Sequence, residues 1–238
     1  MKKLLLSIAV FVVSVSAIAQ KSVINDPNAS PRTISGSFNK IKISGGIDLY
    51  LSQYESESVA VSATTEKFRD NIKTVVENNT LKIYYDGGKN WVSGDKKLKA
   101  YVSFKTLEKL EASGACDVQV AGAITSRSLE IDFSGASDFK GAVEVEELTI
   151  DLNGASDARI SGKAKNLSVQ STGASDVKGY DLVTETCTAK ASGASDINIT
   201  VNKEISAHAS GASDISYRGN AVIKDKQASG ASSVSKRG

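Results

Sequence analysis

The sequence predicts an all-β fold, a right-handed parallel β-helix (solenoid) whose coils are about 19 residues long. A Gly-Ala-Ser-Asp motif recurs at nearly constant spacing, apolar and polar residues alternate between its copies, and no copy shows apolar residues at helical spacing. Because a unit this short cannot bury its own apolar face, we expect the units to stack through parallel strands. The usual handedness of crossover connections favours a right-handed coil.

Residues 1–19 predict a secretory signal peptide. Lys2 and Lys3 precede an apolar segment from Leu4 to Ala19, which ends in a small-residue cleavage site. The segment is shorter than the roughly 20 residues that span a bilayer. We therefore expect an exported protein, in the periplasm, on the outer surface or secreted, with no transmembrane segment after signal removal.

Residues 20–36 are polar and contain both prolines, which predicts a flexible lead-in. Residues 37–110 predict irregular N-terminal β coils that form a cap continuous with the solenoid, with a separate small domain as the alternative. Within them Ser44-Gly45-Gly46-Ile47-Asp48 is a degenerate first copy of the motif, and Asn78-Asn79 predicts a turn. Strands are expected at 40–43, 47–53, 58–64, 72–77, 81–85 and 98–104, and a helical turn at 66–71.

Residues 111–238 predict the regular coils and a polar C-terminal cap. The motif glycines are 114, 135, 154, 173, 193, 211 and 230. Residues six positions before these glycines form one expected core column, namely Leu129, Leu148, Leu167, Cys187 and Ile205. Cys187 is then a small buried hydrophobe, and Cys116, in a serine position several coils away, is too distant for a disulfide. In the last copy Ser233 replaces aspartate, and Lys224 and Lys226 replace apolar residues.

The motif itself makes specific demands on the backbone. Its glycine predicts a positive φ or a close backbone approach, and its alanine an interior or stacked position. Its aspartates predict an acidic column, in which neighbours repel by about 1 kcal/mol in water. Hydrogen bonds from turn N–H groups or bound cations such as calcium would relieve that repulsion. The column comprises Asp117, Asp138, Asp157, Asp176, Asp196 and Asp214.

Aromatic residues gather before residue 105, and three of them are candidate ligand-binding residues. Tyr84 and Tyr85 precede a glycine-rich segment, residues 86–95, that contains Trp91. Large aromatic side chains on loops form platforms for ligands. The alternative is that they fill the core of wide coils.

Composition excludes several functions. One histidine and two cysteines exclude a His-rich metal site and a Cys-His zinc module, and no cofactor is expected. Without Lys2 and Lys3 the chain has 27 basic and 27 acidic residues, so it lacks the charge of a nucleic-acid-binding protein. The basic residues Arg127, Lys140, Arg159 and Lys178 are interpreted as not sharing one column, so no catalytic residues are assigned.

The signal peptide, the Gly46-Ile47-Asp48 segment and the repeated Ser-Gly-Ala-Ser-Asp motif together resemble the putative auto-transporter adhesin, head GIN domain family of bacteria. The resemblance covers residues 37–220, and Asp48 stands where the family name has asparagine. It implies a right-handed β-helical fold, an exported location and an adhesin-like role.

We therefore expect an exported, non-enzymatic binding or structural β-helix that contacts an envelope polysaccharide or a surface protein. One alternative is a polysaccharide lyase or hydrolase on the same scaffold. Another is a structural solenoid stiffened by calcium at the aspartate column.

Overall fold

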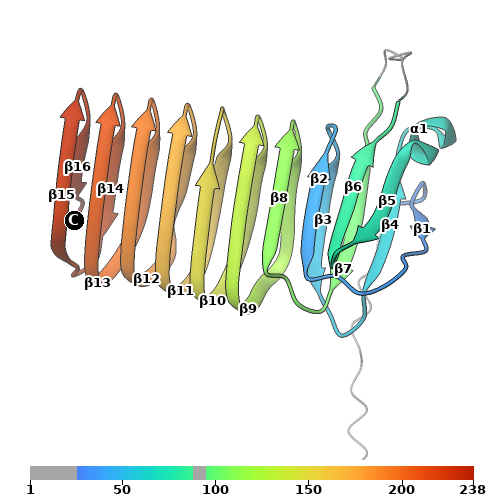
Figure 1. The fold of residues 1–238 in the computed structure, drawn as a ribbon, viewed down its shortest axis with the longest axis horizontal. Helices are drawn as coiled ribbons and strands as arrows, with labels where there is room; N and C mark the ends of the chain where they lie inside the picture. Colours follow the sequence, from blue (N-terminus) through green and yellow to red (C-terminus); the bar gives the residue numbers. More distant parts are fainter. Residues whose placement is uncertain (1–25, 88–94) are drawn as a thin grey trace, which may run out of the picture.

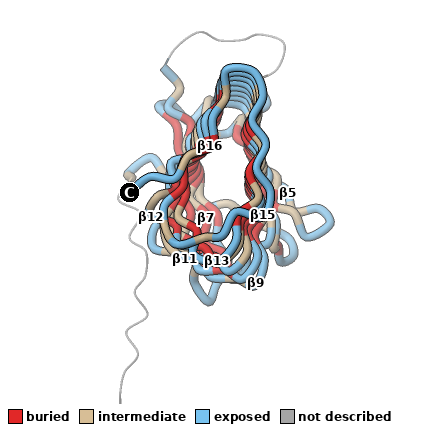
Figure 2. Tube along the Cα trace, turned by 90° about the vertical axis from the view of Figure 1, so that its left-hand side faces the viewer, coloured by how far each residue is buried: buried red, intermediate tan, exposed pale blue. Residues whose placement is uncertain are grey.

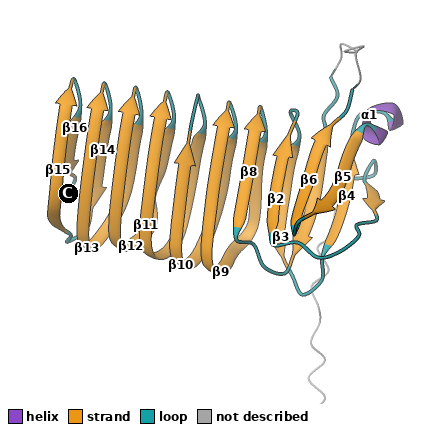
Figure 3. Ribbon diagram, viewed as in Figure 1, coloured by secondary structure: helices purple, strands orange, loops and turns teal. Residues whose placement is uncertain are grey.

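The computed structural model describes residues 26–87 and 95–238, so the predicted signal peptide lies outside the described residues. Strands account for 71% of the chain and wind into a β-solenoid of about seven turns of about 19 residues (Figure 1). The only α-helix in the described residues is the five-residue α1 (Glu66–Asp70), coloured purple in Figure 3. The prediction of an all-β solenoid is confirmed.

The regular coils begin at β8 (Lys109–Gly114) and pair in parallel to the last strand. Leu129, Leu148, Leu167, Cys187 and Ile205 are successive register partners, and all are buried. The predicted core column is therefore confirmed. The strands are β9 (Asp117–Gly135), β10 (Asp138–Leu152), β11 (Asp157–Gly173), β12 (Asp176–Gly193), β13 (Asp196–Gly211), β14 (Asp214–Arg218), β15 (Val222–Gly230) and β16 (Ser233–Lys236).

Each coil forms two walls that enclose the core. Buried positions line the inside of the tube, while the turns at its upper edge are exposed (Figure 2). Between β9 and β10 the core contains two aromatic rings: those of Phe133 and Phe139 meet edge to face with centroids 6.0 Å apart. Because the core is filled by side chains, function must reside on the outer faces.

The N-terminal region shares the same walls, but the order of its coils in space differs from their order in the chain. Strand β2 (Lys40–Ser44) pairs with both β6 (Thr80–Tyr85) and β8. Strand β3 (Asp48–Gln53) likewise pairs with both β7 (Lys99–Phe104) and β9. The first coil therefore lies between two later ones, and the expected continuous spiral holds only from β8 onwards.

Antiparallel strands close the N-terminal end. Strand β4 (Ser58–Ser62) pairs with β7, and β1 (Ser30–Arg32) pairs with β4. Strand β5 (Ile72–Glu77) forms a hairpin with β6, whose two-residue turn has positive φ at Asn78 and Asn79, as type I′ turns require. The expectation of a flexible lead-in is wrong for residues 30–32, because they form β1 and Arg32 donates to the Arg69 carbonyl at 2.8 Å.

The last coil is polar, as predicted, but Lys224 does not occupy the column position that the sequence predicts for it. Lys226 is the register partner of the buried Ala207, as expected. A bulge makes Ile223, and not Lys224, the partner of Ile205. Lys224 instead forms an ion pair with Glu204 at 3.1 Å.

Candidate ligand-binding face

From Gly135 onwards the glycine of each motif is required for two reasons. The motif glycines have φ between 76° and 95°, as in Gly173 with φ 90°. A Cβ atom on Gly173 would lie 2.5 Å from the carbonyl oxygen of Gly154 in the preceding coil. The following Ala174 donates its N–H to that same oxygen at 2.7 Å. The alanines follow glycines that are register partners from coil to coil, and they are exposed at the turn, so of the two expected alternatives the structure favours the stacked position over the interior one.

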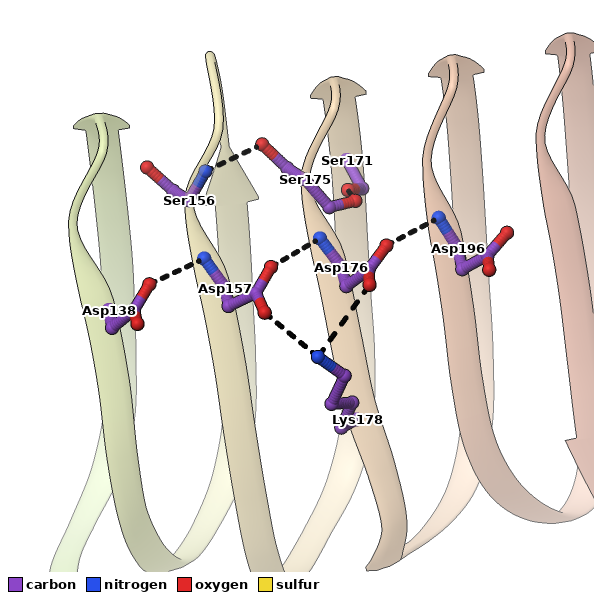
Figure 4. A network of polar contacts seen from close by, with 8 residues as sticks. All are labelled: Asp138, Ser156, Asp157, Ser171, Ser175, Asp176, Lys178 and Asp196. Carbon is purple, nitrogen blue, oxygen red and sulfur yellow. Dashed lines mark hydrogen bonds and ion pairs between the residues drawn. The ribbon is translucent and has the colours of Figure 1, made fainter.

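In the five copies from Ser137 to Ser213, the motif serine is a buried hydrogen-bonding group. The Ser156 hydroxyl donates to the Asn153 carbonyl at 3.1 Å, and the Ser156 N–H donates to the Ser175 hydroxyl at 3.1 Å. Figure 4 shows the second contact crossing from one coil to the next. These bonds satisfy backbone groups that the tight turn leaves without a partner in its own strand. Serine therefore supports the fold and takes no part in the outer surface.

The aspartate column is exposed or half-buried and is bonded along the solenoid axis. The backbone N–H of Asp157 donates to the carboxylate of Asp138 at 3.2 Å, and Asp176 donates to Asp157 in the same way at 3.2 Å (Figure 4). Asp196 continues the pattern onto Asp176 at 3.3 Å. The sequence predicts that N–H groups of the aspartate's own turn donate to its carboxylate. In these three bonds the donor N–H belongs instead to the aspartate of the next coil.

Lys178 neutralises part of this column. Its ammonium lies 2.8 Å from the Asp157 carboxylate and 3.6 Å from that of Asp176 (Figure 4). The hydrogen bond to Asp157 raises the pKa of Lys178 above its ordinary value. The lysine therefore stays charged and offsets the repulsion between the two carboxylates.

Three basic residues share a column beside the aspartates, which corrects the interpretation drawn from the sequence. Lys140 is the register partner of Arg159, and Arg159 is the register partner of Lys178. Each stands five residues after a motif glycine, so the alignment on glycine would have found them. Only Arg127 lies elsewhere, where it pairs with Glu146 at 3.6 Å. We call Lys140, Arg159 and Lys178 the basic column.

The basic column continues toward the N-terminus with an amide and two tyrosines. Gln119 is the register partner of both Lys140 and Tyr50, and Tyr50 is the partner of Tyr101. The two half-buried tyrosine rings stack with centroids 5.1 Å apart and an angle of 19° between planes. Sequence analysis missed this arrangement because it depends on β3 lying beside β9.

The basic column lies between two shallow hollows. One, of about 170 Å³, is lined by Asp117, Asp138, Asp157 and the whole basic column, among others. The other, of about 510 Å³, is lined by Lys140, Arg159 and Asp181 among others. The strand register shifts here, after Lys140 between β9 and β10 and after Arg159 between β11 and β12. Such bulges bend strands and redirect side chains, so this face departs locally from the regular repeat.

The aromatic residues selected from the sequence do not lie on this face. Tyr84 is 40% exposed, whereas Tyr85 packs against the core with the Lys96 ammonium 4.9 Å from its ring centre. Both belong to β6, in the wall that β2 and β8 continue. Trp91 lies outside the described residues.

The histidine and the two cysteines of the chain, which are candidate nucleophiles or metal ligands, lie outside this face and are either bonded or buried. His208 is bonded to Asp225 at 2.7 Å, and Cys116 and Cys187 are buried, unpaired thiols. Burial raises the pKa of both thiols, which disfavours the reactive thiolate. Within residues 26–87 and 95–238, no group of three or more His, Cys, Asp or Glu side chains is placed to hold a metal ion.

The fold and motif identify the family. The sequence model of the family described as putative auto-transporter adhesin, head GIN domain, matches residues 37–221. The chain belongs to this family. No curated protein matches it. In the part of the chain that the structure describes, no helix is long and apolar enough to cross a membrane.

Solved structures share the fold of this family member. A putative adhesin from Bacteroides fragilis is 21% identical with a TM-score of 0.78, over 88% of this chain and 96% of that one. A putative lipid binding protein from Parabacteroides distasonis is 20% identical with a TM-score of 0.71, over 90% and 98%. A putative adhesin from Parabacteroides merdae is 18% identical with a TM-score of 0.67, also over 90% and 98%.

Proposed function

We propose that this protein is an exported, non-enzymatic binding module that holds an envelope polysaccharide or a surface protein on the outer face of its solenoid. The observation that carries this proposal is the exposed column of polar and charged side chains that crosses successive coils from Gln119 to Lys178. The rigid parallel strands fix the spacing of these side chains, which lowers the entropy cost of binding an extended partner.

The bonding of the aspartates favours binding over catalysis. A general acid or base needs a carboxyl group free to exchange a proton with substrate. The Asp138, Asp157 and Asp176 carboxylates instead accept backbone N–H bonds from the next coil. These carboxylates therefore stabilise the stacking of successive coils.

The test is a binding screen of the mature protein against cell-envelope polysaccharides and surface proteins on an array. We expect retention of at least one extended polymer without its degradation. Tyr84→Ala and Trp91→Ala test the aromatic residues that the sequence selects, because loss of binding in either variant would assign them to the site. Failure to retain any polysaccharide or surface protein would refute the proposal.

A polysaccharide lyase is the second candidate, and the hollow beside Arg159 favours it. Three carboxylates and three cations line that hollow where the strand register shifts. A lyase needs a base close to a site that neutralises the uronate carboxylate. Incubation with acidic polysaccharides, with and without calcium, tests this function: new unsaturated ends in the product would replace the binding proposal.

A calcium-stiffened solenoid is the third candidate, and it would need cations held between pairs of carboxylates, because the described residues contain no group of three metal-ligating side chains. Cations between successive carboxylates would relieve their repulsion and bind only the folded chain. Millimolar calcium should then raise the unfolding temperature, and Asp138→Asn should reduce that rise. An unfolding temperature that does not respond to calcium would exclude this role.

A further inference from the structure

The geometry points to an acidic polysaccharide as the ligand, bound across the strands along the solenoid axis. We propose that the basic column, Gln119 and the Tyr50–Tyr101 stack form one track for it. The inference rests on the proposed binding function and names the class of polymer. Within the described residues only Lys178 of these three cations forms an ion pair with the fold, so the fold's own ion pairs do not account for Lys140 and Arg159.

The spacing of the track suits a polymer. Parallel strands lie about 4.8 Å apart, so the side chains of register partners repeat at that interval along the axis. A ligand that follows the column must present a group to nearly every coil, which a chain of linked sugar rings does. A small ligand could occupy only one or two of these positions.

The unpaired charges lie at the centre of the track. Lys178 is held by Asp157 and Asp176, whereas neither Lys140 nor Arg159 forms an ion pair within the described part of the chain. Both side chains are exposed, and both line the two adjoining hollows. Two stacked cations without partners repel each other, and a ligand carboxylate or sulfate would relieve that repulsion.

The neighbouring aspartates favour a ligand that carries hydrogen-bond donors as well as negative charge. On each strand the aspartate stands two residues before the basic residue, about 7 Å away on the same face. A polyanion without hydroxyl groups would meet carboxylates along that edge and be repelled. An acidic polysaccharide presents hydroxyl donors as well as anionic groups, so it matches both columns at once. The stacked tyrosines add apolar edges of the kind that sugar rings contact.

The experiment measures binding of the mature protein to polygalacturonate, with uncharged dextran and hydroxyl-free polyphosphate as comparison polymers. The test variant is K140Q/R159Q, which removes two exposed charges from the track. The control is K163Q/K165Q, which removes two exposed charges from the coil of Arg159, outside the track. Circular dichroism and the unfolding temperature verify that both variants fold.

We expect the wild-type protein to bind polygalacturonate with a salt-dependent affinity and to bind polyphosphate more weakly. K140Q/R159Q should lose at least about tenfold in affinity, or about 1.4 kcal/mol, and K163Q/K165Q less than about twofold. Equal losses of affinity in the two variants would show that the polymer does not bind along the proposed track. Dextran binding that neither variant changes would overturn the acidic ligand but leave the proposed function standing. Binding of no polymer or surface protein would refute the proposed function itself.

Discussion

The carbonyl oxygen of one motif glycine leaves no room for a side chain on the motif glycine of the next coil. The Gly154 oxygen receives the Ala174 N–H and lies 2.5 Å from where a Cβ on Gly173 would be. Gly173→Ala therefore combines an unfavourable φ with a backbone clash. We expect a loss of about 3 kcal/mol in the free energy of unfolding, measured by urea denaturation.

Gly122 supplies the matched control for that substitution. It has a positive φ of 81°, but no atom lies within 4 Å of its missing Cβ. Gly122→Ala should therefore cost only the conformational part, about 1 kcal/mol. If the two variants were equally destabilised, the close contact between successive turns would have no energetic weight.

The two thiols make a second prediction about single residues. Cys116 is buried in a serine position of the motif, and Cys187 is buried in the leucine column. Because burial removes both sulfurs from solvent and raises the pKa of both thiols, neither should react with a thiol reagent in the native protein. Both should react in guanidinium chloride. Rapid labelling of native protein would show that one of these coils opens locally.

On the wall opposite the basic column, neighbouring strands carry carboxylates in different environments. Burial, and then the nearby Asp151 carboxylate, raises the pKa of Asp132. Burial also acts on Glu111, but hydrogen bonds from Lys42 and Lys109 outweigh it and lower the pKa of Glu111. Ionised Asp132 therefore destabilises the fold, and ionised Glu111 stabilises it.

These opposite shifts predict opposite responses to pH. At pH 7, Asp132→Asn should raise the unfolding temperature, and the gain should disappear as the pH falls below about 4, where the wild-type carboxyl is protonated. Glu111→Gln should lower the unfolding temperature at pH 7, and that loss should shrink as Glu111 in the wild-type protein becomes protonated. Thermal unfolding between pH 3 and pH 8 measures both, and changes of the same sign would contradict the assigned environments.

At the level of strands, alternation of apolar residues located nearly every element, because one face of each wall is buried. The strand expected at 72–77 matches β5, and the helical turn expected at 66–71 contains α1. Register could be predicted only where the motif supplies an alignment. Even there the basic column was missed, although Lys140, Arg159 and Lys178 stand at equal distances from their glycines.

Across the whole molecule, local patterns could not predict the position of the first coil. The pairing of β2 with both β6 and β8 joins residues far apart in sequence, and no repeat spans that separation. The stack of Tyr50 on Tyr101 and its continuation to Gln119 depend on this pairing. The part of the candidate site within the repeats was therefore predictable, and the part outside them was not.

The regular region should behave as a chain of nearly equivalent units, since each coil contacts only its two neighbours. Ala158 and Val177 are register partners, so deletion of residues 158–176 removes one complete coil and rejoins the chain in phase. We expect this variant to fold with an unchanged β-sheet circular dichroism spectrum and an unfolding temperature lower by about 5 °C or less. Deletion of residues 158–166 instead removes one wall of the coil and should prevent folding of the C-terminal turns. If the complete-coil deletion unfolded as readily as the partial one, stability would depend on specific contacts in that coil and not on the stacking that all coils share.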